Sequence, residues 1–217
     1  QKLHLMKKYI LLSVFAFFAY SATAVTYTWN GGNGNYNDPN WSVGGGAVCC
    51  APPSAAEIVI SSGQVTLNVN RSAIAVRVNG TGTLRLLAGA DFIVTIGTTA
   101  TFTNSLEIDG PDASVIVEQD AILRLRNSTT NLVRGLYLHG GASFTNRGTT
   151  EVNIPAANIA AIYLQDVGDT FTNNATGFVD LLYSSDTGIL SFGTFLNAGE
   201  IEVHEVVDNG IELRGIG

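Results

Sequence analysis

Residues 135–146 read GLYLHGGASFTN, and residues 161–173 repeat this phrase as AIYLQDVGDTFTN. The phrase returns in a shorter form at residues 188–197, as GILSFGTFLN, and its opening occurs once more at residues 210–213, as GIEL. The four starts, at Gly135, Ala161, Gly188 and Gly210, follow one another at similar intervals. Strand-like units that recur every ~20–30 residues are typical of a solenoid, in which each repeat forms one coil stacked on the previous one.

The most regular part of the repeat is a Phe-x-Asn tail, which begins at Phe102, Phe144, Phe171 and Phe195. In a stack of coils, like positions lie directly above one another at about 4.8 Å. We therefore expect the phenylalanines to stack inside the solenoid and the asparagines to form a hydrogen-bonded ladder at a turn. The longer gap between Phe102 and Phe144 corresponds to two coils, one of which lacks the phrase and is assigned to residues 110–125.

Short runs of β-forming residues continue from Glu57 onward, each followed by a turn signal such as Ser61-Ser62-Gly63 or Asn79-Gly80. No segment has the apolar period of a long helix, and Ala156 to Leu164 is expected to form at most a short helical turn. A sandwich or an up-and-down barrel would also consist of many short strands. The recurring Phe and Asn favour a right-handed parallel β-helix of about six coils, roughly 30 Å long.

The first 24 residues have the pattern of upstream residues and a secretory signal peptide. A basic start and an apolar run, Ile10 to Tyr20, precede the small residues Ala22-Thr23-Ala24. This apolar run is shorter than the ~20 residues that cross a bilayer. We expect cleavage after Ala24, an N-terminal cap and loop region at residues 25–56, and solenoid repeats at residues 57–217. The last repeat is incomplete, which predicts the N-terminal part of a longer protein.

The charge balance limits the choice of partners. The chain has 11 Lys and Arg against 18 Asp and Glu, and its three lysines all lie within the first 24 residues. The mature part therefore keeps eight arginines against 18 acids, a formal charge of −10. Without a basic stripe it is a poor partner for nucleic acid or for an anionic membrane. We expect no membrane-spanning segment in the mature part, whose acidic surface suits a soluble exported protein.

Only two cysteines occur, and they are neighbours, Cys49 and Cys50. Neighbouring cysteines cannot form the framework of spaced disulfides found in many exported domains. A bond between them would close a strained ring that is readily reduced. We interpret the pair as loop residues, with a redox or intermolecular role as the alternative.

The segment before the repeats contains both tryptophans of the chain, Trp29 and Trp41, and Tyr36 between them, among Gly, Asn and Pro. Large aromatic side chains can shield the open end of a solenoid core. We therefore interpret this segment as the N-terminal cap. The alternative is a sugar-binding face made by the three rings.

The same segment carries a resemblance to a known class of proteins. Residues 27–42 read YTWNGGNGNYNDPNWS, and residues 51–60 continue as APPSAAEIVI. This Trp-x-Gly-Gly and Asn-Trp opening, followed by Pro and a first strand, resembles the start of large secreted β-helical proteins of Gram-negative bacteria. These include autotransporter passengers and adhesin-like surface proteins of Bacteroidetes, whose coils are similar to FTNRG at residues 144–148 and FLNAG at residues 195–199. The resemblance implies a rod displayed for adhesion.

Some β-helices are polysaccharide lyases or hydrolases, so acidic pairs need attention. Glycoside hydrolysis requires carboxylates about 5–9.5 Å apart over a cleft, which on a solenoid means acids at matching positions of adjacent coils. The pairs Asp109 with Asp112 and Asp166 with Asp169 each flank a glycine in a turn. We interpret both pairs as turn formers.

Two histidines also lie close to polar residues in the sequence. His139-Gly140-Gly141 is superficially similar to a hydrolase motif, but its neighbours do not supply paired aspartates. Glu200, Glu202 and His204 alternate along an expected strand, and we interpret their shared face as solvated rather than metal-binding. We assign no catalytic, cofactor-binding or metal-binding residue and expect no cofactor.

The sequence therefore predicts an exported structural or adhesive β-solenoid, without enzymatic activity, at the cell surface (outer membrane) or in the extracellular medium. Host or environmental surface glycans or proteins are the expected partners. One alternative is a carbohydrate-active β-helix whose catalytic coils lie beyond residue 217. Another is a glycan-binding β-sandwich module, which would show antiparallel strand pairing.

Overall fold

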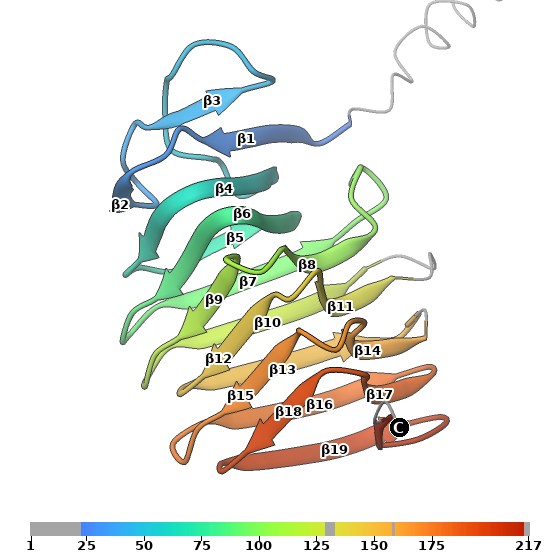
Figure 1. The fold of residues 1–217 in the computed structure, drawn as a ribbon. Helices are drawn as coiled ribbons and strands as arrows, with labels where there is room; N and C mark the ends of the chain where they lie inside the picture. Colours follow the sequence, from blue (N-terminus) through green and yellow to red (C-terminus); the bar gives the residue numbers. More distant parts are fainter. Residues whose placement is uncertain (1–22, 129–132, 158, 215–217) are drawn as a thin grey trace, which may run out of the picture.

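The computed structural model describes residues 23–128, 133–157 and 159–214. Within these residues the chain forms twenty strands and no helix, and parallel strands stack into a β-solenoid of about six turns (Figure 1). The all-β, parallel β-helical fold class predicted from the sequence is confirmed. The predicted signal peptide, apart from its last two residues, lies outside the described residues. In the described ranges there is also no apolar helix of the length that crosses a membrane.

Each turn of the solenoid contributes to three faces. The first face contains β8 (Asn104–Asp109), β11 (Arg134–His139), β14 (Ala160–Leu164), β17 (Thr187–Ser191) and β20 (Ile211–Leu213). The second face contains β9 (Ser114–Val117), β12 (Ser143–Asn146), β15 (Thr170–Asn173) and β18 (Thr194–Asn197). The third face is a separate sheet of β5 (Arg71–Ala73), β7 (Asp91–Ile96), β10 (Ile122–Asn127), β13 (Thr149–Ile154), β16 (Phe178–Ser184) and β19 (Glu200–Val206).

The coils stack in the register that the repeated phrase predicts. Leu136 pairs with Ile162, and Ile162 pairs with Ile189, so the same position of the phrase recurs in consecutive coils. Along each strand, side chains point alternately into the core and outward, because successive residues of a strand face opposite ways. Strands of adjacent coils pair in parallel, and β1 (Val25–Trp29) with β3 (Trp41–Val43) is the antiparallel exception among the described strands. The glycan-binding β-sandwich alternative is therefore wrong.

The interior of the second face contains both predicted ladders. The rings of Phe144 and Phe171 stack with centroids 5.1 Å apart, and those of Phe171 and Phe195 with centroids 5.0 Å apart. Asn146 donates a side-chain hydrogen bond of 2.9 Å to Asn173, whose own amide donates one of 2.8 Å to the side chain of Asn197. Identical residues at one register position of successive coils therefore contact one another along the axis.

Phe102 is not part of this ladder, and its assignment from the sequence is wrong. Val115 lies above Phe144, as expected for a coil that lacks the phrase, but the next position, expected for Phe102, is held by Leu84. Phe102 lies in the loop between β7 and β8, with its ring 4.6 Å from the guanidinium carbon of Arg77. The buried carboxylate of Glu57 holds this loop against the first face by accepting the backbone N–H groups of Thr101 and Phe102.

The first two turns also differ from expectation. Their first and second faces are joined into single long strands, β4 (Ala56–Leu67) and β6 (Ala75–Leu86), instead of being separated by turns. The expected turn signals bend these strands without ending them, because Gly63 and Gly80 adopt positive φ values of 71° and 60°. The backbones pack closely at this corner, where a side chain on Gly63 would overlap the carbonyl oxygen of Gly32.

Trp29, Tyr36 and Trp41 of the N-terminal region are buried beside the first coils. Trp29 packs edge-on against Trp41 at 5.0 Å, and Tyr36 packs against Trp41 at 5.3 Å and against Phe92 of the core at 5.9 Å. The indole of Trp41 donates to the backbone carbonyl of Tyr36. Strand β2 (Asn33–Asn35) adds to β4 next to them. Buried rings cannot stack on a sugar, so the sugar-binding alternative is wrong, and a role as a cap stays a prediction.

Candidate functional site

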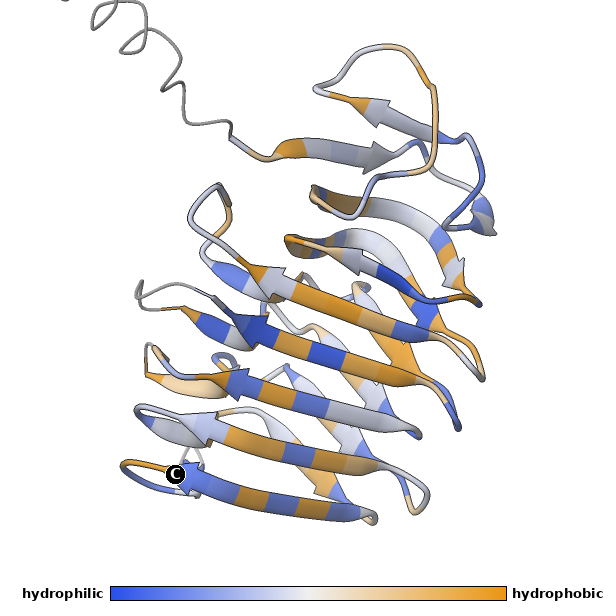
Figure 2. Cartoon of the chain, turned by 180° about the vertical axis from the view of Figure 1, so that it is seen from behind, coloured by the Kyte–Doolittle hydropathy of each residue, from blue (hydrophilic) through white to orange (hydrophobic). Residues whose placement is uncertain are grey.

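The outer side of the third face carries a row of side chains at one register position. Strand pairing aligns Ile93, Arg124, Glu151, Asp180 and Glu202 on β7, β10, β13, β16 and β19. We call these five residues the third-face row. Figure 2 shows the molecule from behind, where charged and apolar residues alternate along the strands of this face. The charged members therefore come from separate coils, distant from one another in the sequence, and meet only in the folded solenoid.

The first part of the row is balanced by an arginine. The Nε of Arg124 lies 3.0 Å from Oδ1 of Asp91, and its Nη1 donates to both carboxylate oxygens of Glu151. Hydrogen bonding to Asp91, and secondarily to Glu151, raises the pKa of Arg124 above its ordinary value. One guanidinium thus links three consecutive strands, β7, β10 and β13, and compensates the carboxylates on either side.

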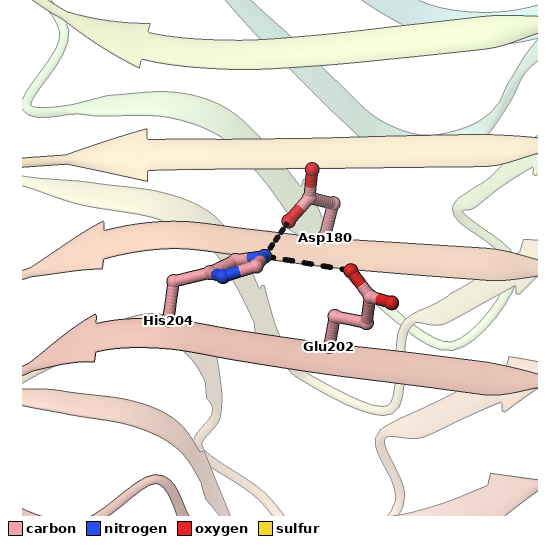
Figure 3. A group of neighbouring side chains, drawn as sticks. All are labelled: Asp180, Glu202 and His204. Atoms are coloured by element: carbon pink, nitrogen blue, oxygen red, sulfur yellow. Dashed lines mark ion pairs between the residues drawn. The ribbon is translucent and has the colours of Figure 1, made fainter.

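The last two members of the row, Asp180 and Glu202, lie beside a histidine instead of an arginine. The Nε2 of His204 lies 3.1 Å from Oδ1 of Asp180 and 3.5 Å from Oε2 of Glu202, and the three side chains converge (Figure 3). One candidate ligand atom from each residue lies within 4.8 Å of the other two. Oδ1 of Asp180 is buried and accepts no hydrogen bond from the described part of the chain. This group can form an ion pair with a protonated imidazole or provide three donors to a cation.

The structure confirms part of what the sequence indicated here and adds a residue. Glu200, Glu202 and His204 are exposed and share one face of β19, as predicted. Asp180 was missed, because the third face lacks the recurring phrase that aligns the other two faces. The spacing could have revealed it, since the interval from Asp180 to Glu202 equals that between the last two starts of the phrase, Gly188 and Gly210.

The turn aspartates behave as the sequence analysis expected. Asp169 is buried, and its Oδ1 accepts the backbone N–H groups of Gly141 and Ala142 on the preceding coil. Burial raises the pKa of Asp169, although these hydrogen bonds oppose the change. Asp166 accepts the backbone N–H of Gly140. Both carboxylates therefore organise a turn between two coils and are engaged with backbone groups.

Asp109 and His139 belong to a different polar cluster on the first face. Nδ1 of His139 lies 3.2 Å from Asp109, and its Nε2 lies 3.4 Å from Glu107. Burial alone would raise the pKa of Glu107, but hydrogen bonds from Asn104 and Arg77 outweigh it and hold the pKa below its ordinary value. Asp112, the other member of the predicted pair, is exposed in the following turn. The predicted pair is thus separated between two environments.

Cys49 and Cys50 are exposed free thiols in the loop that follows β3, consistent with their interpretation as loop residues. Residues 51–54 of the same loop line an open cleft of about 470 Å³ at the start of the third face. Polar side chains of this cleft are Ser54, Asn70, Arg71, Ser72 and Asp91. The charged groups of this cleft are already paired, because Arg71 binds the Asn37 side chain and Asp91 binds Arg124. The side chains that line the cleft therefore do not form a group of converging ligand atoms like that around His204.

Comparisons of the chain with protein-family models, with curated proteins and with solved structures found no significant match.

Proposed function

We propose that this protein is an exported structural β-solenoid that acts as a stiff, adhesive rod at the cell surface or in the extracellular medium. The observation that carries the proposal is the parallel stacking of about six turns, reinforced inside by the Phe and Asn ladders. In such a stack each coil is held by its two neighbours along the whole length of its strands. The result is an extended body with a large outer surface relative to its core.

Three features of the chain support export and adhesion. Strand β1 begins at Val25, the residue that would become the N-terminus if the signal peptide were cleaved after Ala24. The mature part has a net charge of −10 by composition, which favours solubility and disfavours nucleic acid as a partner. The opening segment resembles that of secreted adhesin-like β-helical proteins. We propose surface glycans or proteins as the partners of the rod.

Expression of the full chain in a Gram-negative host tests export directly. We expect the protein outside the cytoplasm with Val25 as its first residue by intact-mass measurement, whereas Ala24→Lys, which removes the small residue at the cleavage point, should leave an uncleaved precursor. Adhesion is tested by presenting the mature protein on beads to arrays of glycans and extracellular proteins. A cytoplasmic protein with an intact N-terminus would contradict export, and beads that bind nothing would contradict adhesion.

A carbohydrate-active enzyme is the second candidate. The observation that favours it is the stacking of Asp180 and Glu202 on adjacent coils, with carboxylate oxygens within 4.8 Å. Retaining glycosidases place their two carboxyl groups about 5–5.5 Å apart. This candidate predicts release of reducing ends from at least one polysaccharide, abolished by Asp180→Asn and by Glu202→Gln. Wild-type protein that releases no sugar and no unsaturated product from a broad panel would exclude it.

A further inference from the structure

The structure assigns a second property to the end of the third-face row. We propose that Asp180, Glu202 and His204 bind one transition-metal ion of the Zn²⁺ class, which fastens β16 to β19. The residues come from two consecutive coils, two from β19 and one from β16, and their side chains point to a common centre (Figure 3). The proposal is independent of adhesion, because it concerns only these side chains.

The distances between the donor atoms fit such an ion. Zn²⁺ binds imidazole nitrogen and carboxylate oxygen at about 2.0–2.2 Å in tetrahedral geometry, so two ligand atoms lie about 3.3–3.6 Å apart. The His204 nitrogen is 3.1 Å from the Asp180 oxygen and 3.5 Å from the Glu202 oxygen. These two separations lie close to tetrahedral edges, and the two carboxylate oxygens lie within 4.8 Å of each other. A bound ion would take the place of the direct nitrogen–oxygen contacts.

The surroundings of the Asp180 oxygen are compatible with a cation. Oδ1 is buried and receives no hydrogen bond of good geometry from the described residues, and its ion-pair contact there is Nε2 of His204 at 3.1 Å. A buried carboxylate oxygen without a hydrogen bond or a cation is unfavourable. The oxygen faces the imidazole nitrogen and the Glu202 carboxylate, where a bound ion would complete its coordination.

The acidic residues around the group favour a bound cation, and the combination of imidazole and carboxylate ligands favours a transition-metal ion. Arg124 of the row compensates Glu151 and the nearby Asp91. Among the described residues, no arginine forms an ion pair with Asp180 or Glu202. Glu200 and Glu205 on the same strand are also exposed acids. Imidazole nitrogen suits Zn²⁺ and its neighbours in the first transition row, whereas Ca²⁺ and Mg²⁺ prefer oxygen ligands alone. His204 has 48% of its side chain exposed, which leaves access for the ion and for a water as fourth ligand.

Calorimetric titration with ZnCl₂ tests the site. The full chain should carry Cys49→Ser and Cys50→Ser, because thiolates are themselves zinc ligands. We expect one ion per chain, with affinity at least tenfold lower in His204→Ala and in Glu202→Gln. Glu205→Gln is the matched control, since it removes an exposed carboxylate from the same strand but outside the group, and it should change the affinity less than twofold. CaCl₂ should bind far more weakly than ZnCl₂.

Hydrogen exchange provides a second readout that does not depend on the heat of binding. Zn²⁺ should slow exchange of the β16 and β19 amides, and this protection should be absent in His204→Ala, whose exposed position makes loss of the fold unexpected. The proposal is overturned if His204→Ala and Glu202→Gln bind Zn²⁺ within twofold of the parent. It is equally overturned if His139→Ala removes the binding, which would place the ion on the first face.

Discussion

The two halves of the solenoid fill the same interior column with different side chains. In the first half, Val65, Leu84 and Val115 stack along the second face, and in the second half Phe144, Phe171 and Phe195 continue the same column. The adjacent column changes from aliphatic to asparagine at the same coil boundary. The backbone register is continuous across this change. A solenoid therefore requires matched burial at each position, and identical residues are one of several ways to provide it.

The boundary itself shows what the polar ladder requires. Asn146 is the first member and lies below Val117, whose side chain cannot donate a hydrogen bond to it. The hydroxyl of Thr150 donates to the Asn146 side-chain oxygen at 3.1 Å, and the Asn146 amide also donates to the backbone carbonyl of Phe178. The ladder can thus begin beside an aliphatic column because a neighbouring strand satisfies its first oxygen.

The largest effect is expected from a charge in the aromatic half of the column. Phe171→Asp buries a carboxylate between two rings and should lower the free energy of unfolding by about 4 kcal/mol or more, measured by urea denaturation. Thr172→Asp is the matched control, because residue 172 points outward from the same strand, and it should cost less than about 1 kcal/mol. A Phe171→Asp variant that melts like the parent would contradict the internal Phe stack.

The next effect concerns the corner of the first half, where one long strand bends instead of ending at a turn. Gly63→Ala in the first half combines an unfavourable positive φ with overlap of the Gly32 backbone, and we expect a loss of about 2–4 kcal/mol in the free energy of unfolding. Gly89→Ala tests the conformational part alone, since its φ is 80° and no atom lies within 4 Å of the added carbon. It should cost about 1 kcal/mol. Equal losses from the two substitutions would show that the corner is not closely packed.

A smaller effect is expected when an asparagine of the second half is replaced by the aliphatic residue type found in the same column of the first half. Asn173→Leu introduces an aliphatic side chain like those at the same position in the first half, but leaves Asn146 and Asn197 without their partner, and should cost about 1–3 kcal/mol. Replacing all three asparagines by Leu should cost less than the sum of the three single changes, because no ladder amide is then left unpaired. Simple additivity in denaturation experiments would mean that the asparagines act independently.

The smallest effect concerns Glu107, which connects the halves by contacting Arg77 on one side and His139 on the other. Its pKa is lowered in the folded protein, so its contribution to stability is present above the ordinary pKa and is lost as the pH falls through the lowered value. Between about pH 5 and pH 3, the parent should therefore lose more stability than Glu107→Gln, by less than about 1 kcal/mol. Parallel stability curves for the two proteins in this range would exclude such a contribution.

The same contrast explains how much of the fold could be predicted from the sequence. In the second half, repeated letters such as Phe171 and Asn173 mark their register positions, so coil boundaries and strand pairing follow directly. In the first half the column is filled by Val and Leu, which occur at many other positions, and no pattern identifies their partners. Phe102 matched the phrase by its residue type alone, whereas its place in the structure depends on the distant carboxylate of Glu57.

The candidate site was less predictable for a related reason. Glu202 and His204 lie on one strand and could be placed together from alternation, but Asp180 approaches them only through the pairing of β16 with β19. Outward positions are not constrained by packing, so their residues vary from coil to coil and give no repeat to follow. The corner glycines were recognised as special positions, yet the choice between a bend and a turn depends on contacts with the N-terminal segment, such as that of Gly63 with Gly32.

The parallel pairing between coils has a mechanical consequence. Inter-coil hydrogen bonds of the parallel ladders run roughly along the solenoid axis. A force that pulls a chain end away from the stack therefore opens the bonds of the outermost coil one after another, before those of inner coils, which keep neighbours on both sides. Coil lengths are unequal, since the coil from Ile58 to Val76 is much shorter than the coil from Val76 to Leu106. Each detachment would release about 60–100 Å of extended chain. A pulled molecule would lengthen in discrete steps and dissipate work at each one, while the coils still attached keep their shape.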